Sequence, residues 1–181
     1  MSKEGIIADG FTRAYPMFIV IYSLMNGLLN NSKENIVFCG ILMISDMLNN
    51  ILKRYIFAPL MGKGYRVPLL GIGTRPPNSK NSGLFKDGTL SNTYGMPSGH
   101  AQISWLFATY WSLKIWNDKR GAASKIISIM VLCFFATMVT YSRVYWAKCH
   151  TVQQVVVGSV VGIILGNISY KGLQIYFPPA N

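Results

Sequence analysis

The chain is poor in ionisable and metal-binding side chains. Among 181 residues it has two histidines, six acidic residues and three cysteines, and only 13% of the residues are charged. The cysteines, Cys39, Cys133 and Cys149, form neither a C-x-x-C pair nor a metal-ligand spacing. We interpret them as thiols that pack within helices. No cluster of His, Cys and carboxylate is available for zinc, and no paired carboxylates are available for magnesium. We therefore predict a protein without a metal or another cofactor.

Hydrophobic residues, by contrast, make up 51% of the chain, which exceeds what a soluble core of this size needs. Several apolar runs are close to the length of a helix that crosses a bilayer. They lie at residues 15–29, 36–52, 98–116, 122–142 and 151–177. We predict an all-α, polytopic membrane helix bundle of about five spans, or six helices, that forms a single membrane-embedded domain over residues 1–181.

The net charge of +11 comes from Lys and Arg residues that are scattered over connectors and segment ends. They form no continuous surface interleaved with aromatic residues, so nucleic acid is not an expected partner. Basic residues at span ends contact lipid headgroups, and those between the second and third spans also attract anionic substrates. The expected partner is the lipid bilayer, and the sequence leaves the oligomeric state open.

Alternating spans place the polar connectors on two membrane faces. The connector over residues 53–97, rich in Gly, Pro, Asn, Lys and Arg, falls on the same face as the end of the fourth span and the start of the fifth. We expect this connector to cap that face, because so long a segment in a compact domain usually has a function. In the fifth span, Gly158, Gly162 and Gly166 recur every four residues and predict a close helix-packing face.

Both histidines lie where an apolar run meets a polar connector on this capped face. Pro97-Ser98-Gly99-His100 opens the third apolar run, and the free N–H groups of a helical first turn, with the Ser98 hydroxyl, suit a phosphate oxygen. The alternative interpretation is an ordinary helix start with an interfacial histidine.

Ser142-Arg143 ends the fourth span, and His150 precedes the fifth with Gln154 one turn later. Arg143 is a fixed positive charge for a phosphate, or else a side chain that snorkels to headgroups. The amide of Gln154 can bond one ring nitrogen of His150 and leave the other free to attack, unless His150 is only an interfacial histidine.

In order and spacing these elements resemble the membrane-bound type 2 phosphatidic acid phosphatase superfamily, over roughly residues 46–166. The resemblance rests on Arg75-Pro76, on Pro97-Ser98-Gly99-His100, and on Ser142-Arg143 followed by His150. The runs Tyr94–Gln102 and His150-Thr151-x-x-Gln154-Val155 most resemble the dolichyl diphosphatase branch, which also has Gln where other branches have Asp.

Two departures from the family pattern concern spacing. The family lysine would fall at Pro68, so we match it to Lys53 through Asp46-x-x-Asn49-x-x-x-Lys53, with Lys63 as the rival. Six residues, not five, separate Arg143 from His150, so the connector must bulge by one residue. Asp46 is expected to support the bundle, by pairing with Lys53 or bonding Asn49.

The resemblance implies a metal-independent lipid phosphatase or diphosphatase that works through a phosphohistidine. His150 would be the nucleophile, Gln154 would orient it and His100 would be the general acid and base. The implied phosphate ligands are Lys53, Arg75, Ser98, Gly99 and Arg143. The implied substrate is a polyprenyl, dolichyl-type diphosphate, with phosphatidate or another lipid phosphate as the alternative.

The resemblance also implies an internal membrane such as the endoplasmic reticulum, with the site on the lumenal or extracytoplasmic face. The excess of Lys and Arg on that face would instead favour the cytoplasm by the positive-inside tendency. An interpretation of another class is a catalytically inactive membrane protein that keeps the bundle and binds lipid or a partner as a scaffold.

Overall fold

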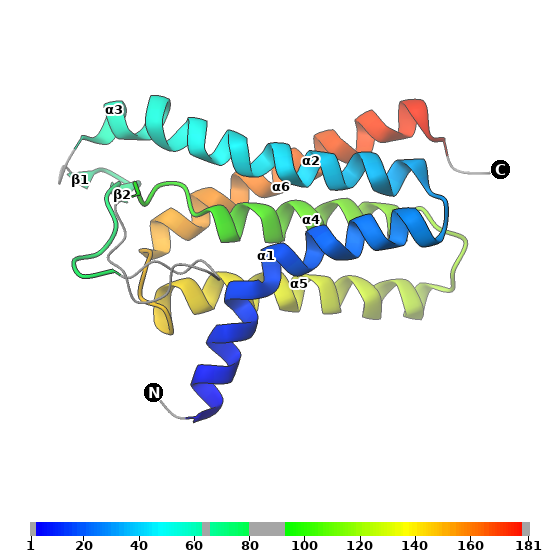
Figure 1. Ribbon diagram of the computed structural model, residues 1–181, viewed down its shortest axis with the longest axis horizontal. Coiled ribbons are helices and arrows are strands. Elements are labelled where there is room, and N and C mark those ends of the chain that lie inside the picture. The colour runs from blue at the N-terminus through cyan, green and yellow to red at the C-terminus, as the bar shows by residue number, and fades with distance from the viewer. Residues whose placement is uncertain (1–2, 63–65, 80–92, 179–181) are drawn as a thin grey trace.

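The computed structural model describes residues 3–62, 66–79 and 93–178. Long helices dominate this part of the chain, and Figure 1 shows them as one bundle. Their bounds are α1 (Lys3–Leu29), α2 (Lys33–Ile51), α4 (Gly99–Trp116), α5 (Ala122–Tyr145) and α6 (Val152–Tyr176). A short antiparallel hairpin of β1 (Arg66–Val67) and β2 (Gly71–Ile72) follows α2 and its extension. The prediction of an all-α bundle is confirmed.

The second helix runs further than the sequence indicated. After α2 the chain stays helical through a π-helical segment, η1 (Leu52–Phe57), and then through α3 (Ala58–Met61). The mostly apolar residues that follow the Lys53-Arg54 pair sustain the helix, so this pair does not begin the connector. The predicted connector boundary at residue 53 is therefore wrong: the connector begins after Met61, and Lys53 is a helical residue.

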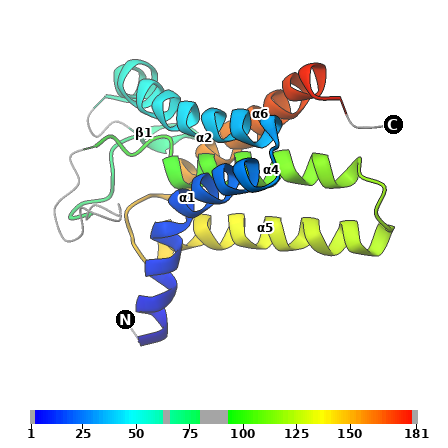
Figure 2. The ribbon, with the colours of Figure 1, turned by 45° about the vertical axis from the view of Figure 1, so that its right-hand side comes forward.

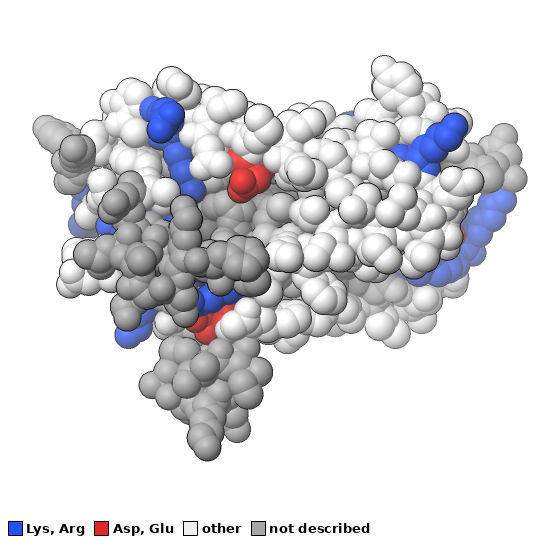
Figure 3. Space-filling model, viewed as in Figure 1, with Lys and Arg blue, Asp and Glu red and all other residues white. Residues whose placement is uncertain are grey.

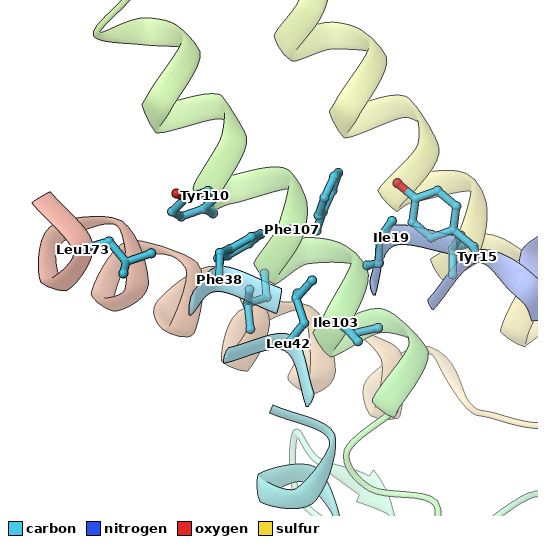
Figure 4. Close-up of a cluster of buried hydrophobic side chains, with 10 residues drawn as sticks. Tyr15, Ile19, Phe38, Leu42, Ile103, Phe107, Tyr110 and Leu173 are labelled. Atoms are coloured by element: carbon cyan, nitrogen blue, oxygen red, sulfur yellow. The ribbon is translucent and has the colours of Figure 1, made fainter. Parts of the chain in front are cut away.

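Helix α4 is the centre of the bundle. It packs against α1, α2, α5 and α6, and it lies between them in both Figure 1 and Figure 2. The stacked rings of Phe38 and Tyr110, with centroids 3.7 Å apart, join α2 to α4 in the core that Figure 4 shows. Ile19 from α1 and Leu173 from α6 extend the same core. Because its neighbours enclose α4, this helix need not be as apolar as a helix that faces lipid.

The outer helices present apolar side chains to their surroundings. By length and composition, the helical stretches Lys33–Met61, Ala122–Tyr145 and Val152–Tyr176 can each cross a membrane. Large apolar side chains such as Met47, Phe134 and Ile168 are more than 60% exposed on them. On the face in Figure 3, Lys and Arg gather toward the two ends and leave a largely uncharged stretch between them. These features make the chain an integral membrane protein.

The three glycines of the fifth apolar run form the contact between α6 and α4. A methyl group added at Gly158 would meet the backbone of Ser98, and one added at Gly162 would meet the carbonyl of Gln102. At Gly166 it would meet Thr109 and the carbonyl of Leu106. The predicted packing face is confirmed. It brings α6 close enough to set the first turn of α4 beside the start of α6.

We predict that Gly162→Ala lowers the thermal stability of the detergent-solubilised protein. The added methyl group would overlap α4 backbone, which cannot yield as a side-chain end can, at a cost of about 1–3 kcal/mol. Gly172→Ala is the matched control, because nothing lies within 4 Å of the corresponding position on the same helix. Equal melting temperatures for the two variants would contradict the packing account.

Candidate active site

A cavity of about 170 Å³ lies at the end of the bundle where the 62–98 connector and the α5–α6 turn meet. Five of the eight predicted catalytic and phosphate-binding residues line it together: Lys53, Arg75, Gly99, His100 and His150. The other three, Ser98, Arg143 and Gln154, are fully buried next to these residues in the chain or bonded to them. The segments that carry these eight residues are far apart in sequence, and the fold brings them to one end.

The turn between α5 and α6 fixes the backbone of His150. The backbone N–H groups of Cys149 and His150 both donate to the carbonyl of Arg143, at 3.0 and 3.2 Å. Lys148 has a φ of 48°, in the left-handed region, where the chain reverses. The tight turn accommodates the six residues between Arg143 and His150. Cys149 is fully buried in it, and its Sγ contacts the same carbonyl at 3.6 Å.

The imidazole of His150 is held by both nitrogens. Nδ1 lies 2.9 Å from Oε1 of Gln154, and Nε2 lies 3.3 Å from Nη1 of Arg75. A guanidinium only donates, so Nε2 carries the lone pair. An amide oxygen only accepts, so the proton is on Nδ1. The arrangement makes His150 neutral, with its lone pair on Nε2, in a residue that also lines the cavity.

The orientation of the Gln154 amide follows from its other contacts. Its Nε2 donates to the carbonyls of Ile72 and Thr74, at 2.9 and 2.7 Å. Its Oε1 accepts from the N–H of Thr151 at 3.3 Å, within a capping box that begins α6. One buried side chain thus connects the helix start, the His150 ring and the segment just before Arg75.

Arg75 is positioned by hydrogen bonds to its own connector and to the α5–α6 turn. Its Nη1 donates to the carbonyl of Cys149 at 3.1 Å, and its Nε and Nη2 donate to the Thr93 hydroxyl at 3.2 and 3.0 Å. The guanidinium is therefore placed beside His150 by contacts with its own connector and with the α5–α6 turn. Thr93 carries no motif, and only the fold identifies its role.

The first turn of α4 lines another side of the small cavity, through Gly99 and His100. Ser98 is the N-cap of α4, its N–H donates to the carbonyl of Gln154 at 3.0 Å, and its buried Oγ has no partner among the described residues. The Nε2 of His100 lies 3.4 Å from the carbonyl of Arg13 in α1. The carbonyl accepts, so Nε2 carries a proton in the neutral and in the cationic form of the ring, and Nδ1 is the nitrogen that gains or loses the second proton.

A buried amide pair joins α2 to this turn. Asn49 donates to Oε1 of Gln102 at 2.8 Å, and Gln102 donates to the carbonyl and hydroxyl of Ser45 at 2.8 and 2.9 Å. Of the two contacts expected for Asp46, the bond to Asn49 is not formed, because the Asn49 amide donates to Gln102 of α4 instead. Asp46 does line the cavity with Lys53, and their opposite charges interact. The rival lysine, Lys63, lies outside the described residues.

Arg143 is completely buried, so the alternative that it snorkels to headgroups is wrong. Its Nη2 donates to Thr12 Oγ1 at 2.9 Å and lies 3.4 Å from Oδ1 of Asp9, both in α1. Its Nε donates to Ser142 at 3.1 Å, while Nη1 has no partner among the described residues. Asp9 and Thr12 precede the first apolar run and lie outside every motif, so no signal in the sequence identifies them.

Electrostatics favour the uncharged form of His150. Burial, and next the positive charge of Arg75, hold the pKa of His150 well below its ordinary value of 6.5, although the bond to Gln154 opposes the shift. The ring is therefore neutral at neutral pH, and Nε2 keeps an unprotonated lone pair, which accepts from Arg75. A neutral imidazole within a group of cationic side chains suits attack on an anionic phosphorus centre.

Fold and site together define a class: a polytopic helical membrane protein whose two histidines and several cationic side chains surround a small cavity at one end of the bundle. The family model of the PAP2 superfamily matches residues 35–176, and the chain belongs to this superfamily. The family resemblance drawn from the motifs is confirmed.

Three relatives match parts of the chain. Dolichyldiphosphatase 1 of Dictyostelium discoideum is 41% identical over 90 residues, which are 48% of this chain and 39% of the relative. Dolichyldiphosphatase of Saccharomyces cerevisiae is 27% identical over 157 residues, 86% of this chain and 58% of the relative. Lipid phosphate phosphatase gamma of Arabidopsis thaliana is 37% identical over 81 residues, 41% of this chain and 34% of the relative. The matches thus span less than two thirds of each relative, and no solved structure matches the chain.

We predict that ¹⁵N NMR of the two histidines will show His150 neutral at pH 6.5, with its proton on Nδ1. On acidification the ring takes up its second proton only well below that pH, because burial and Arg75 disfavour the cation. Arg75→Gln removes the charge and should raise the midpoint, whereas Arg66→Gln, at an exposed connector arginine, should not. A wild-type midpoint at or above 6.5 would contradict the assignment.

Proposed function

We propose that the chain is a metal-independent lipid phosphatase that hydrolyses a membrane lipid phosphate, most readily a polyprenyl diphosphate, through a phosphohistidine on His150. The observation that carries the proposal is the placement of the His150 ring. Gln154 holds its Nδ1 proton, Arg75 faces its Nε2 lone pair, and His100 lines the same cavity. Family membership and the names of the three relatives support the same reaction class.

In the first step, Nε2 of His150 attacks the terminal phosphorus as the bond from phosphorus to the leaving oxygen breaks. For this step His100 is protonated on both ring nitrogens, and it gives its Nδ1 proton to that oxygen, so the leaving group of a diphosphate substrate is the lipid monophosphate. The phosphorylated ring carries a positive charge, and the amide oxygen of Gln154 stabilises it through the Nδ1 proton. His100 is left neutral.

In the second step, His100 takes a proton from a water molecule as the water oxygen attacks phosphorus. The bond between Nε2 and phosphorus breaks, inorganic phosphate leaves, and both histidines return to their initial states. Charge spreads over the non-bridging oxygens in both steps. The proposed ligands for those oxygens are cationic or donate hydrogen bonds, and they replace the charge that a metal would supply. They are Lys53, Arg75, Ser98, the Gly99 N–H and Arg143.

A diphosphate is favoured because a second cavity adjoins the first. This cavity, of about 540 Å³, shares Asn50 and Lys53 with the smaller one and is also lined by Arg54, Tyr55 and Tyr94. Lys53 and Arg54 make it cationic, which suits the phosphate that remains on the lipid. The tyrosines suit the level of the membrane interface, where a lipid tail enters from the bilayer. Phosphatidate, with one phosphate, would leave Arg54 unused.

We propose an internal membrane, such as the endoplasmic reticulum, with the site facing the lumen or the extracytoplasmic side. The resemblance to the dolichyl diphosphatase branch supports this orientation. The excess of Lys and Arg on the same face argues for the cytoplasm. That excess includes Lys53, Arg75 and Arg143, which the reaction requires there whichever way the protein faces.

Phosphate release from a polyprenyl diphosphate by the detergent-purified protein should persist in EDTA and should be abolished by His150→Ala. His100→Ala should slow it roughly 100-fold to 10,000-fold, because it removes the general acid and base. Phosphatidate, tested beside the diphosphate in mixed micelles, should be the slower substrate. Near-normal release by either variant would contradict the roles, and no release by the wild type would favour a lipid-binding scaffold.

Arg54→Gln should separate diphosphate from monophosphate substrates. Loss of a charge-assisted hydrogen bond to the second phosphate should lower kcat/KM for the diphosphate about 10-fold to 100-fold. Hydrolysis of the polyprenyl monophosphate should change less than about twofold, since it has no second phosphate. Arg66→Gln is the control for loss of a positive charge, because Arg66 is exposed and lines neither cavity. Equal losses on both substrates would show that Arg54 does not bind the second phosphate.

A further inference from the structure

The N-terminal half of α1 lies against the active site, although α1 precedes the family-matched residues 35–176. Pro16 is inside this helix, and Figures 1 and 2 show the helix changing direction along its length. Proline removes one helical hydrogen bond and kinks the chain. Pro16 also lines the small cavity. The kink thus places the turn over residues 9–13 beside the site.

Two side chains of that turn hold Arg143. Thr12 Oγ1 accepts from Nη2 at 2.9 Å, and Oδ1 of Asp9 lies 3.4 Å from the same nitrogen. The other oxygen of Asp9 pairs with Nε of Arg13 at 2.7 Å, and the Thr12 hydroxyl donates to the Asp9 carbonyl at 3.0 Å. Asp9 is 5% exposed, and Thr12 and Arg143 are fully buried. A guanidinium at such depth requires a carboxylate partner.

The pair does not satisfy the whole guanidinium. Nε and Nη2 are bonded, but the buried Nη1 has no partner within the described residues. A purely structural ion pair at zero exposure would be expected to use all its donors, because an unpaired buried donor is costly. The two remaining N–H groups of Nη1 are suited to an anion that is bound only during turnover.

The same turn contacts His100 directly and is linked to His150 through Arg143. The carbonyl of Arg13 accepts from Nε2 of His100, and the carbonyl of Arg143 accepts from the N–H of His150. Arg143 therefore connects the turn of α1, through its side chain, to the backbone of His150, through its carbonyl. The turn of α1 and the two histidines form one connected set of contacts.

We propose that Asp9 and Thr12 are positioning residues for phosphoryl transfer. They clamp Arg143 from one side, so that its Nη1 donors are held toward the non-bridging oxygens of the transferring phosphoryl group. This inference rests on the proposed function for its consequence in turnover, and on the contacts above for its effect on anion binding. It makes α1 a component of the active site.

Asp9→Asn and Thr12→Val should lower kcat about 10-fold to 100-fold with little change in KM, because a misplaced Arg143 weakens the transition state more than the ground state. Thr12→Ser keeps the hydroxyl and should retain most of the activity. Orthovanadate, which mimics the five-coordinate phosphorus, should bind each impaired variant more weakly by a similar factor.

The matched control is Glu34→Gln. Glu34 accepts hydrogen bonds from Tyr110 and from Lys114, each at 2.6 Å, at the other end of the bundle. The Glu34→Gln substitution breaks a comparable ion pair far from the site, so it should leave kcat and vanadate affinity unchanged. If Asp9→Asn does not fold, the comparison of Thr12→Val with Thr12→Ser carries the test, since these variants retain every charge.

Vanadate binding separates this inference from the proposed function. A wild type that binds vanadate but releases no phosphate would refute the proposed activity, and weaker vanadate binding by Asp9→Asn would still support the positioning role. Wild-type kcat and vanadate affinity in both Asp9→Asn and Thr12→Val would overturn the inference. Tighter vanadate binding by Asp9→Asn would also overturn it, because Asp9 would then compete with the phosphate. A wild type that fails to bind vanadate would overturn both proposals.

Discussion

Gln154 bonds simultaneously to the ring of His150 and to the backbone that leads into Arg75, and the site depends on this double contact. Its oxygen accepts the Nδ1 proton, while its amino group donates to the carbonyls of Ile72 and Thr74. A carboxylate could accept the same proton but would repel those carbonyls, because it has no donor when ionised. The amide therefore fixes the tautomer of the ring and the position of the connector at once.

The packing of α6 on α4 places this contact where it can act. The glycine face brings the two helices close enough for the carbonyl of Gln154 to accept from the N–H of Ser98. The polar network of the site is thus confined to one end of a bundle whose interior is otherwise largely aromatic and aliphatic. Buried polar groups are stable there because nearly all of them have partners. Within the described residues Ser98 Oγ and Arg143 Nη1 have none, and both belong to proposed phosphate ligands.

Local patterns in the sequence predicted much of this arrangement. Hydropathy identified the membrane bundle, the four-residue spacing of Gly158, Gly162 and Gly166 identified the helix contact, and the motifs identified the residues that meet at the cavity. Each of these signals lies within one short segment, and its physical meaning is local: a helix face, a helix start, or a turn.

What the sequence could not predict depends on contacts between distant segments. The bonds from Asp9 and Thr12 to Arg143 join residues more than 130 positions apart, and no periodicity links them. The placement of Lys53 on a helix needed the π-helical extension, which the basic pair at Lys53-Arg54 concealed. Thr93 was likewise invisible, because threonine in a polar connector has no distinctive signal until Arg75 is found beside it.

In the proposed mechanism Gln154 presents Nε2, and only Nε2, of His150 to phosphorus. The most direct measurement is to quench the enzyme during turnover of a polyprenyl diphosphate and to determine by ³¹P NMR and peptide mapping which nitrogen carries phosphate. The account predicts an acid-labile phosphohistidine at Nε2 of His150. Phosphate on Nδ1, on His100, or on no histidine while product accumulates would contradict it.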